Sequence, residues 1–184
     1  SSIVPYDEAT LLHIGTDAQS LIAANPADTD AYIAAALVAG STNHLQDAID
    51  LLSRALAQSP NDGYLYYQRG NANLDVQDWQ QATDDLMAAI DNQFVTASVY
   101  NSLGIAYSNM GQDVVAITQY ENAISIAPDW GLLYSNLGIT YDDVGSYDQA
   151  LDHYKTALTV DPLLAMAYRN RAHTNQTIQD YDAA

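Results

Sequence analysis

One spacing limits the folds open to this chain more than any other feature. Tyrosine returns every 34 residues, and columns of small residues and of proline keep the same period. The aligned positions are Tyr32, Tyr66, Tyr100, Tyr134 and Tyr168; Ala36, Gly70, Gly104, Gly138 and Ala172; Ala48, Ala82, Ala116, Ala150 and Ala184; Ala55, Ala89, Ala123 and Ala157; and Pro26, Pro60, Pro128 and Pro162, with Phe94 replacing one proline. A constant period of this length predicts stacked copies of one supersecondary unit.

Each copy carries the pattern of two helices. In residues 131–164, apolar or small side chains recur three or four positions apart, as one face of a helix requires. Gly145 interrupts this pattern and suits the left-handed backbone at a helix end, and Pro162 ends the second helix. We therefore predict an all-α chain of antiparallel helix pairs. Because one pair cannot bury its apolar face alone, the pairs should stack into an α-solenoid.

This pattern resembles the tetratricopeptide repeat (TPR) family, which has the same period. The resemblance is strongest in Asn101-Ser102-Leu103-Gly104 with Tyr107 and in Asn136-Leu137-Gly138 with Tyr141. It is weakest in the first repeat, where Ala39 and Asn43 replace an expected aromatic residue and an expected glycine. The resemblance implies a right-handed superhelix with repeats at 29–62, 63–96, 97–130 and 131–164, and a partial repeat at 165–184.

The segments outside the complete repeats are also expected to be helical. Residues 6–24 are amphipathic, so the segment 1–28 should form a capping helix or the second helix of a preceding repeat. At the other end, the period places Ala184 a few residues into a second helix. We therefore expect Tyr168 and Ala172 to lack a cover, which makes this end a candidate surface for a homo-oligomer.

The charge balance argues against two classes of partner. The chain holds 23 acidic and 5 basic residues, with a net charge of −18. Nucleic acid and anionic membrane surfaces both attract clustered Lys and Arg, so neither is expected as a partner. No apolar run approaches the ~20 residues that cross a bilayer, and no signal peptide is evident. The compartment stays undetermined, although much Asp, Asn, Gln and Thr beside little Lys and Glu favours an exported bacterial protein over a cytoplasmic one.

Patterns typical of catalysis or metal binding are missing, so we expect no enzyme activity, no metal and no cofactor. The chain has no cysteine, and its four histidines, His13, His44, His153 and His173, are dispersed. No Gly-rich phosphate loop and no nucleophilic serine motif appears. Arg69 falls in a column that should be partly buried, and the resemblance implies Asp85 of the same repeat as its structural partner.

The candidate binding surface is the inner face of the first helices, which in TPR proteins lines a concave groove. Carboxamides offer donors and an acceptor, so a ladder of them can bond the backbone of an extended peptide. One row reads Ala34, Gln68, Ser102, Asn136 and Asn170, with Asn71, Asn101 and Ser135 beside it. Apolar or aromatic anchors, together with one histidine, are expected at Ile33, Leu37, Tyr64, Tyr67, Ile105, Leu132, Ile139, Met166 and His173.

The charges of this face favour a neutral-to-basic ligand. Arg169 is the only cation of the row, whereas several aspartates lie on or near it, namely Asp30, Asp75, Asp142 and Asp143. TPR domains that grip acidic peptide ends use a clamp of Lys and Arg. The equivalent positions here hold Tyr67, Ser98, Ser102, Leu132 and Asn136, so this clamp is absent.

Three hypotheses follow from these features. The first is a protein-interaction scaffold whose groove binds an extended neutral-to-basic peptide or a partner helix. The second is a structural module that self-assembles through the solenoid ends. The third is a substrate-docking arm of a larger enzyme, as in some glycosyltransferases with TPR arms.

Overall fold

The computed structural model describes residues 7–182, with side chains described except at positions 8 and 180–182. Tyr6 and Ala184, which the sequence assigned to helices, lie outside this range. The described residues form α-helices and no strand, which confirms the all-α prediction. The helices are α1 (Glu8–Ala24), α2 (Thr29–Ser41), α3 (Leu45–Gln58), α4 (Gly63–Asp75), α5 (Trp79–Asp91), α6 (Ala97–Asn109), α7 (Asp113–Ile126), α8 (Gly131–Asp143), α9 (Tyr147–Val160) and α10 (Ala165–Asp182).

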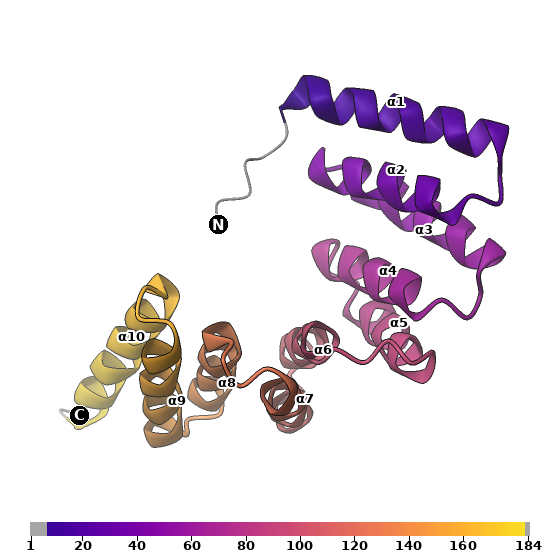
Figure 1. Ribbon diagram of the computed structural model, residues 1–184. Helices are drawn as coiled ribbons and strands as arrows, with labels where there is room; N and C mark the ends of the chain where they lie inside the picture. The colour runs from indigo at the N-terminus through magenta and orange to yellow at the C-terminus, as the bar shows by residue number, and fades with distance from the viewer. Residues whose placement is uncertain (1–6, 183–184) are drawn as a thin grey trace. The chain divides into compact units, whose positions relative to one another are not determined.

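The helices divide into two compact units. Unit 1 spans Ser1–Phe94 and contains α1 to α5, and unit 2 spans Val95–Ala184 and contains α6 to α10. Within each unit, every helix packs against the next one along the chain (Figure 1). In unit 2, α8 also contacts α6 and α10. Packing of this kind, between neighbours in the sequence, is that of a solenoid, and it confirms the predicted fold class.

The first helix of each complete repeat ends in the same way. The residues two positions beyond these helices are Asn43, Gln77, Gly111 and Gly145, and they have φ values of +63°, +63°, +69° and +75°. The left-handed conformation predicted for Gly145 is therefore present, and it also occurs at two positions without glycine. Asn adopts this conformation readily because its short side chain bonds locally, whereas Gln has no such advantage. The packing of the helix pair therefore imposes this left-handed turn even where the residue is not glycine.

Small and large side chains meet between the paired helices, as the columns predict. Gly104 lies against the ring of Tyr120, and a Cβ at position 104 would be 2.5 Å from the Cε1 atom of that ring. Gly138 faces Tyr154 in the same way, with a distance of 2.6 Å. Glycine is therefore required at both positions by the close approach of a buried aromatic ring. The alanines at 55, 89, 123 and 157 are fully buried in the same layers.

The last helix differs from its expected form. We expected a turn before Ala184 and the start of a second helix, but α10 continues without interruption to Asp182. Gln179 occupies the column of the left-handed residues and lies inside this helix. The expected turn is therefore wrong. Among the described residues, α10 packs against α8 and α9, and no second helix folds back on it. Tyr168 is 47% exposed and Ala172 is also exposed, in agreement with the uncovered face that the sequence predicts.

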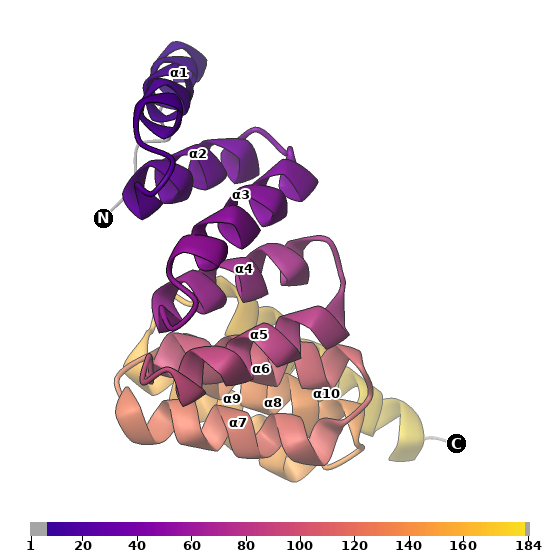
Figure 2. The same cartoon turned by 90° about the vertical axis from the view of Figure 1, so that its right-hand side faces the viewer.

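The two views of the chain show the helices of unit 1 layered one upon another, from α1 to α5 (Figure 2). The buried residues of α1, α2 and α3 form one core, in which Ala18, Tyr32 and Leu52 are among the most buried side chains. Among the described helices, none is both long and apolar enough to span a membrane.

Candidate functional site

A polar network holds together three helices of unit 1. Arg69 on α4 donates from Nε and Nη2 to the carboxylate of Asp85 on α5, at 2.9 and 2.6 Å. Its Nη1 donates to Ser53 Oγ on α3 at 3.1 Å, and Asn73 Nδ2 donates to the same carboxylate at 3.0 Å. The hydrogen bond with Asp85 raises the pKa of Arg69, and partial burial opposes this effect. The pairing predicted for Arg69 is confirmed, so this cation has a structural partner.

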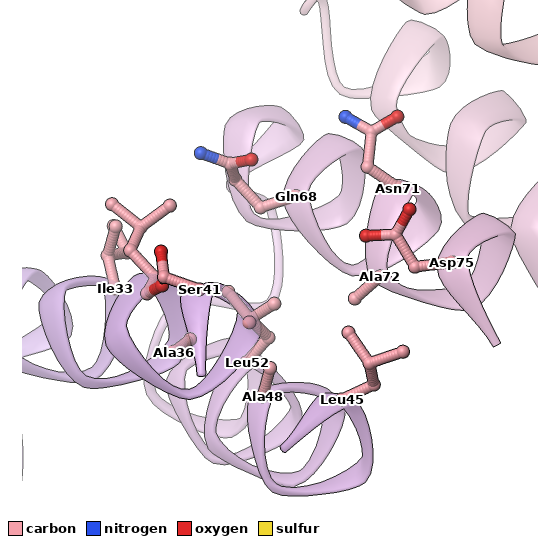
Figure 3. A pocket seen from close by; sticks show the side chains of 12 residues that line it. Ile33, Ala36, Ser41, Leu45, Ala48, Leu52, Gln68, Asn71, Ala72 and Asp75 are labelled. Atoms are coloured by element: carbon pink, nitrogen blue, oxygen red, sulfur yellow. The ribbon is translucent and has the colours of Figure 1, made fainter. Parts of the chain in front are cut away.

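A cavity of about 350 Å³ opens between α2, α3 and α4 (Figure 3). Its walls are apolar or small, and its rim is polar. The walls are Ile33, Ala36, Leu37, Gly40, Leu45, Ala48, Leu52 and Ala72, and the rim is Ser41, Gln68, Asn71 and Asp75. We call this cavity the α2–α4 pocket. It brings together two predicted carboxamides, Gln68 and Asn71, and two predicted anchors, Ile33 and Leu37. Apolar walls with a few convergent polar groups are typical of ligand sites.

The rim of the α2–α4 pocket carries one charged residue. Asp75 at the end of α4 is exposed, and no ion pair among the described residues neutralises it. Gln68 donates from Nε2 to the hydroxyl of Tyr64, which fixes the direction of its amide. Leu37 is 55% exposed on the wall of the pocket. An open apolar surface and an unpaired carboxylate therefore lie side by side.

Two predicted anchors belong to an aromatic cluster at the start of α4. The rings of Tyr64 and Tyr67 lie 6.4 Å apart, and both contact Phe94, at 5.5 and 5.4 Å. In the sequence pattern, Phe94 stands out only as a substitute for proline, and nothing in the pattern indicates its contact with these rings. Part of the surface of Tyr64 and Tyr67 is consequently used within the chain.

The row of predicted groove residues that contains Asn136 and Asn170, here called the polar row, forms some of its hydrogen bonds within unit 2 itself. Asn136 on α8 donates from Nδ2 to Asn101 Oδ1 on α6 at 2.9 Å. Asn101 and Ser102 are only 9% and 6% exposed, so they offer little surface to a ligand. Their predicted role as groove-lining residues therefore needs correction: Asn101 supports Asn136 from within the helix layer. Asn136 and Asn170 are half-buried and retain donors and acceptors toward the surface.

The remaining predicted residues of unit 2 lie at different depths. Ile105, Leu132 and Ile139 are partly buried, whereas Arg169 and His173 are exposed on α10. Nδ1 of His173 lies 3.8 Å from the Asp142 carboxylate. Partial burial raises the pKa of Asp143, and the nearby carboxylates of Asp113 and Asp142 add to this effect. Unit 2 is therefore acidic next to its apolar anchors.

The described residues do not form a metal centre. No group of three or more His, Asp or Glu side chains among residues 7–182 is arranged to hold a metal ion. His153 stacks on Tyr141 with ring centroids 5.2 Å apart, and burial lowers its pKa. His13 lies 3.4 Å from Asp17 on the exposed surface of α1. Each of these histidines has a local structural contact.

Comparison with known proteins agrees with this architecture. The tetratricopeptide repeat family model matches residues 95–162. A crystal structure of MamA is 28% identical and has a TM-score of 0.75, with 80% of this chain and 86% of MamA covered. MamA from Desulfovibrio magneticus RS-1 is 17% identical, with a TM-score of 0.78 and coverage of 84% and 88%.

A third similar structure is the crystal structure of YrrB, a TPR protein with an unusual peptide-binding site. YrrB is 22% identical to this chain, with a TM-score of 0.72. It covers 88% of this chain, and 84% of YrrB is covered. Among curated proteins, no sequence matched this chain. Residues 95–162 match the tetratricopeptide repeat family model, and the repeat columns, the packed helix pairs and the shared fold extend the likeness to the other helix pairs.

Proposed function

We propose that this protein is an interaction scaffold whose two units each bind an extended, neutral-to-basic segment of a partner, unit 1 through the α2–α4 pocket and unit 2 through the carboxamides of α8 and α10. TPR proteins generally act as non-enzymatic scaffolds for protein or peptide partners, and the proposal takes that class as its starting point. The observation that carries it is the 350 Å³ cavity, with its apolar walls and its rim of Gln68, Asn71 and Asp75.

Charge supports the choice of a neutral-to-basic partner. The chain has a net charge of −18, which disfavours the approach of acidic segments. Both arginines of unit 1 already have partners, because Arg69 binds Asp85 and Arg54 lies 4.9 Å from the ring of Tyr32. Among the described residues, no Lys, Arg or His side chain lies within ion-pair distance of Asp75 on the pocket rim. A Lys or Arg side chain of a partner would supply the missing positive charge.

Unit 2 supplies a second set of groups for the same task. Asn136 and Asn170 offer hydrogen bonds to the backbone of an extended segment, and Ile105, Leu132 and Ile139 offer apolar contacts. Backbone bonds of this kind hold a segment without reading its sequence. The α2–α4 pocket is therefore expected to provide most of the sequence preference.

The test compares two substitutions of exposed aliphatic residues. Leu37→Asp places a charge on the pocket wall, and Val114→Asp places the same charge on α7, where Val114 is 79% exposed and lines no part of the α2–α4 pocket. Binding is measured on an array of extended neutral and basic peptides. We expect Leu37→Asp to weaken the peptides bound by the wild type by roughly tenfold or more, since one buried Leu is worth ~1.5–3 kcal/mol. Val114→Asp should bind as the wild type does.

A further pair of variants tests the polar row. Asn136→Ala with Asn170→Ala removes the two carboxamides that face the surface. Weaker binding of all peptides, irrespective of their sequence, is the expected result. Wild-type binding in both Leu37→Asp and the double Asn variant would contradict the proposed surface.

The exposed face of α10 favours self-association as a second candidate function. Tyr168 and Leu163 are both exposed large side chains on or next to this helix. Sedimentation velocity of the chain and of Tyr168→Lys tests this candidate. A wild-type protein that remains monomeric at high concentration would leave the candidate without support.

A further inference from the structure

We propose that the α2–α4 pocket accepts an aromatic side chain of the partner segment, flanked by a basic residue. This inference rests on the proposed function and names the chemistry that the pocket selects. It comes from a comparison of unit 1 with the equivalent positions of unit 2.

In unit 2, the chain fills the equivalent space with its own tyrosine. Two periods beyond Leu52, Ala36 and Asp75 lie Tyr120, Gly104 and Asp143. The Tyr120 ring is buried against Gly104, where a Cβ would be 2.5 Å from it. Burial raises the pKa of Tyr120, and the charge of the Asp143 carboxylate adds to this effect. Asp143 holds the same column in unit 2 that Asp75 holds on the pocket rim.

The next repeat fills its space in the same way. Tyr154 is buried against Gly138, where a Cβ would lie 2.6 Å from the ring. Both tyrosines thus depend on a glycine opposite them. In both repeats of unit 2, the helix layer accommodates an aromatic ring at this level because the opposing residue is a glycine.

In unit 1, no aromatic ring of the chain occupies the equivalent space. Leu52 replaces the tyrosine and is shorter, and Ala36 replaces the glycine. Figure 3 shows these two residues beneath an opening that Gln68 and Asp75 border from α4. Gly40 widens the opening, because a Cβ at this position would meet no atom within 4 Å. The Ala36 methyl group and the Leu52 side chain fill the inner part of this space, so the α2–α4 pocket corresponds to the part of the tyrosine site that stays open toward the Asp75 rim.

The residues that line the pocket determine which partner side chain fits it. The walls of the α2–α4 pocket carry no charged side chain. An aromatic ring of the partner therefore packs against the aliphatic groups of Ile33, Leu45 and Ala72. Asp75 stands at the rim as the equivalent of Asp143, and its carboxylate accepts a hydrogen bond from a phenol hydroxyl or from a neighbouring Lys. A tyrosine or phenylalanine with a basic neighbour satisfies both parts of the site.

The first experiment varies the guest. The probes are acetylated and amidated peptides of sequence Gly-Lys-Ala-X-Ala-Lys-Gly, in which X is Tyr, Phe, Leu or Ala. They are titrated into the full ¹⁵N-labelled chain, and amide shifts are followed at Ile33, Gly40 and Ala72. We expect the Tyr and Phe peptides to bind about tenfold or more tightly than the Ala peptide, since a buried aromatic ring contributes far more than a methyl group.

The second experiment fills the pocket. Gly40→Leu projects into the open space and favours the helix, so the variant is expected to stay folded. Ala36→Gly with Leu52→Tyr copies the filled arrangement of unit 2 and serves if Gly40→Leu disturbs the fold. Either variant should bind the Tyr and Ala peptides equally weakly, with an unchanged helical circular dichroism spectrum. Asp75→Asn should weaken binding of the Lys peptides several-fold relative to versions in which Gln replaces Lys. Asp91→Asn, at an exposed position at the end of α5, should not have this effect.

The outcomes separate this inference from the proposed function. Equal binding of the Tyr and Ala peptides to the wild type, with binding still lost in Leu37→Asp, would overturn the aromatic preference and leave the scaffold standing. If a folded Gly40→Leu variant still binds the Tyr peptide more tightly than the Ala peptide, the proposed role of the pocket in aromatic preference is also overturned. If no peptide of the array or of this series binds, the proposed function and the inference both fail.

Discussion

The Arg69–Asp85 pair allows a quantitative test of what holds unit 1 together. Asp85→Ala removes the acceptor for two Arg69 hydrogen bonds and one Asn73 hydrogen bond. Breaking a buried ion pair on one side costs ~3–5 kcal/mol, and the 24% exposure of the Arg69 side chain places this case near the lower value, about 3 kcal/mol. Arg69→Leu should cost a similar amount, since it leaves a buried carboxylate with only Asn73 beside it.

The double variant distinguishes a pair from two independent residues. Arg69→Leu with Asp85→Gln copies Leu103 and Gln119 at the same columns of the next repeat. A buried pair replaced on both sides by compatible residues is often neutral, so we expect a cost of ~1 kcal/mol or less. The coupling between the two positions should then exceed ~2 kcal/mol.

The assay is urea unfolding followed by circular dichroism. With a slope of ~2 kcal/mol/M, a loss of ~3 kcal/mol moves the midpoint by ~1.5 M. Because repeat arrays unfold with limited cooperativity, amide hydrogen exchange should show the loss first in α3, α4 and α5. A single variant that moves the midpoint by less than ~0.3 M, or a double variant as unstable as either single one, would refute the reasoning.

Three further predictions concern local packing, backbone and pH. Gly104→Ala should lower stability by ~1–3 kcal/mol because the new Cβ meets the Tyr120 ring, whereas Gly40→Ala, which meets nothing, should raise it by ~0.5–1 kcal/mol; thermal melts that shift in the same direction would contradict this. Gln77→Gly should stabilise the chain by up to ~1 kcal/mol by relieving its φ of +63°, which urea unfolding measures, and a loss of stability would count against strain at this turn. Burial lowers the pKa of His153 in the folded chain, so protonation favours unfolding and stability falls as pH drops below ~6.5; His153→Gln should reduce the fall in melting temperature between pH 7 and 5, and an unchanged fall would show that other groups cause it.

The periodic columns predicted the helix pairs and the solenoid class because a repeat presents the same contact several times. Tyr32 and its equivalents mark the same position along every first helix, so an error at one position is corrected by the others. The end of α10 escaped prediction for a physical reason. Gln179 is chemically the same as Gln77, yet only Gln77 lies where a second helix folds back and forces a left-handed turn.

The candidate site was harder to predict than the fold. Period and helix geometry place Asn101 and Asn136 near one surface, but they do not show that one amide donates to the other. The α2–α4 pocket depends on a difference in side-chain volume between Leu52 and Tyr120. That difference is present in the sequence, but its effect requires the distance between α2 and α4, which only the packed structure provides.

The network around Arg69 also bears on how such an array can change its length. Ser53, which accepts one of the Arg69 hydrogen bonds, belongs to the preceding repeat. One period later its column holds Met87, which offers no comparable acceptor. A tandem duplication of residues 63–96 would therefore present the second arginine with a thioether where the first one meets a hydroxyl. The first two repeats of this chain are a matched pair, and insertions or deletions of whole repeats should be tolerated better after residue 96 than between them.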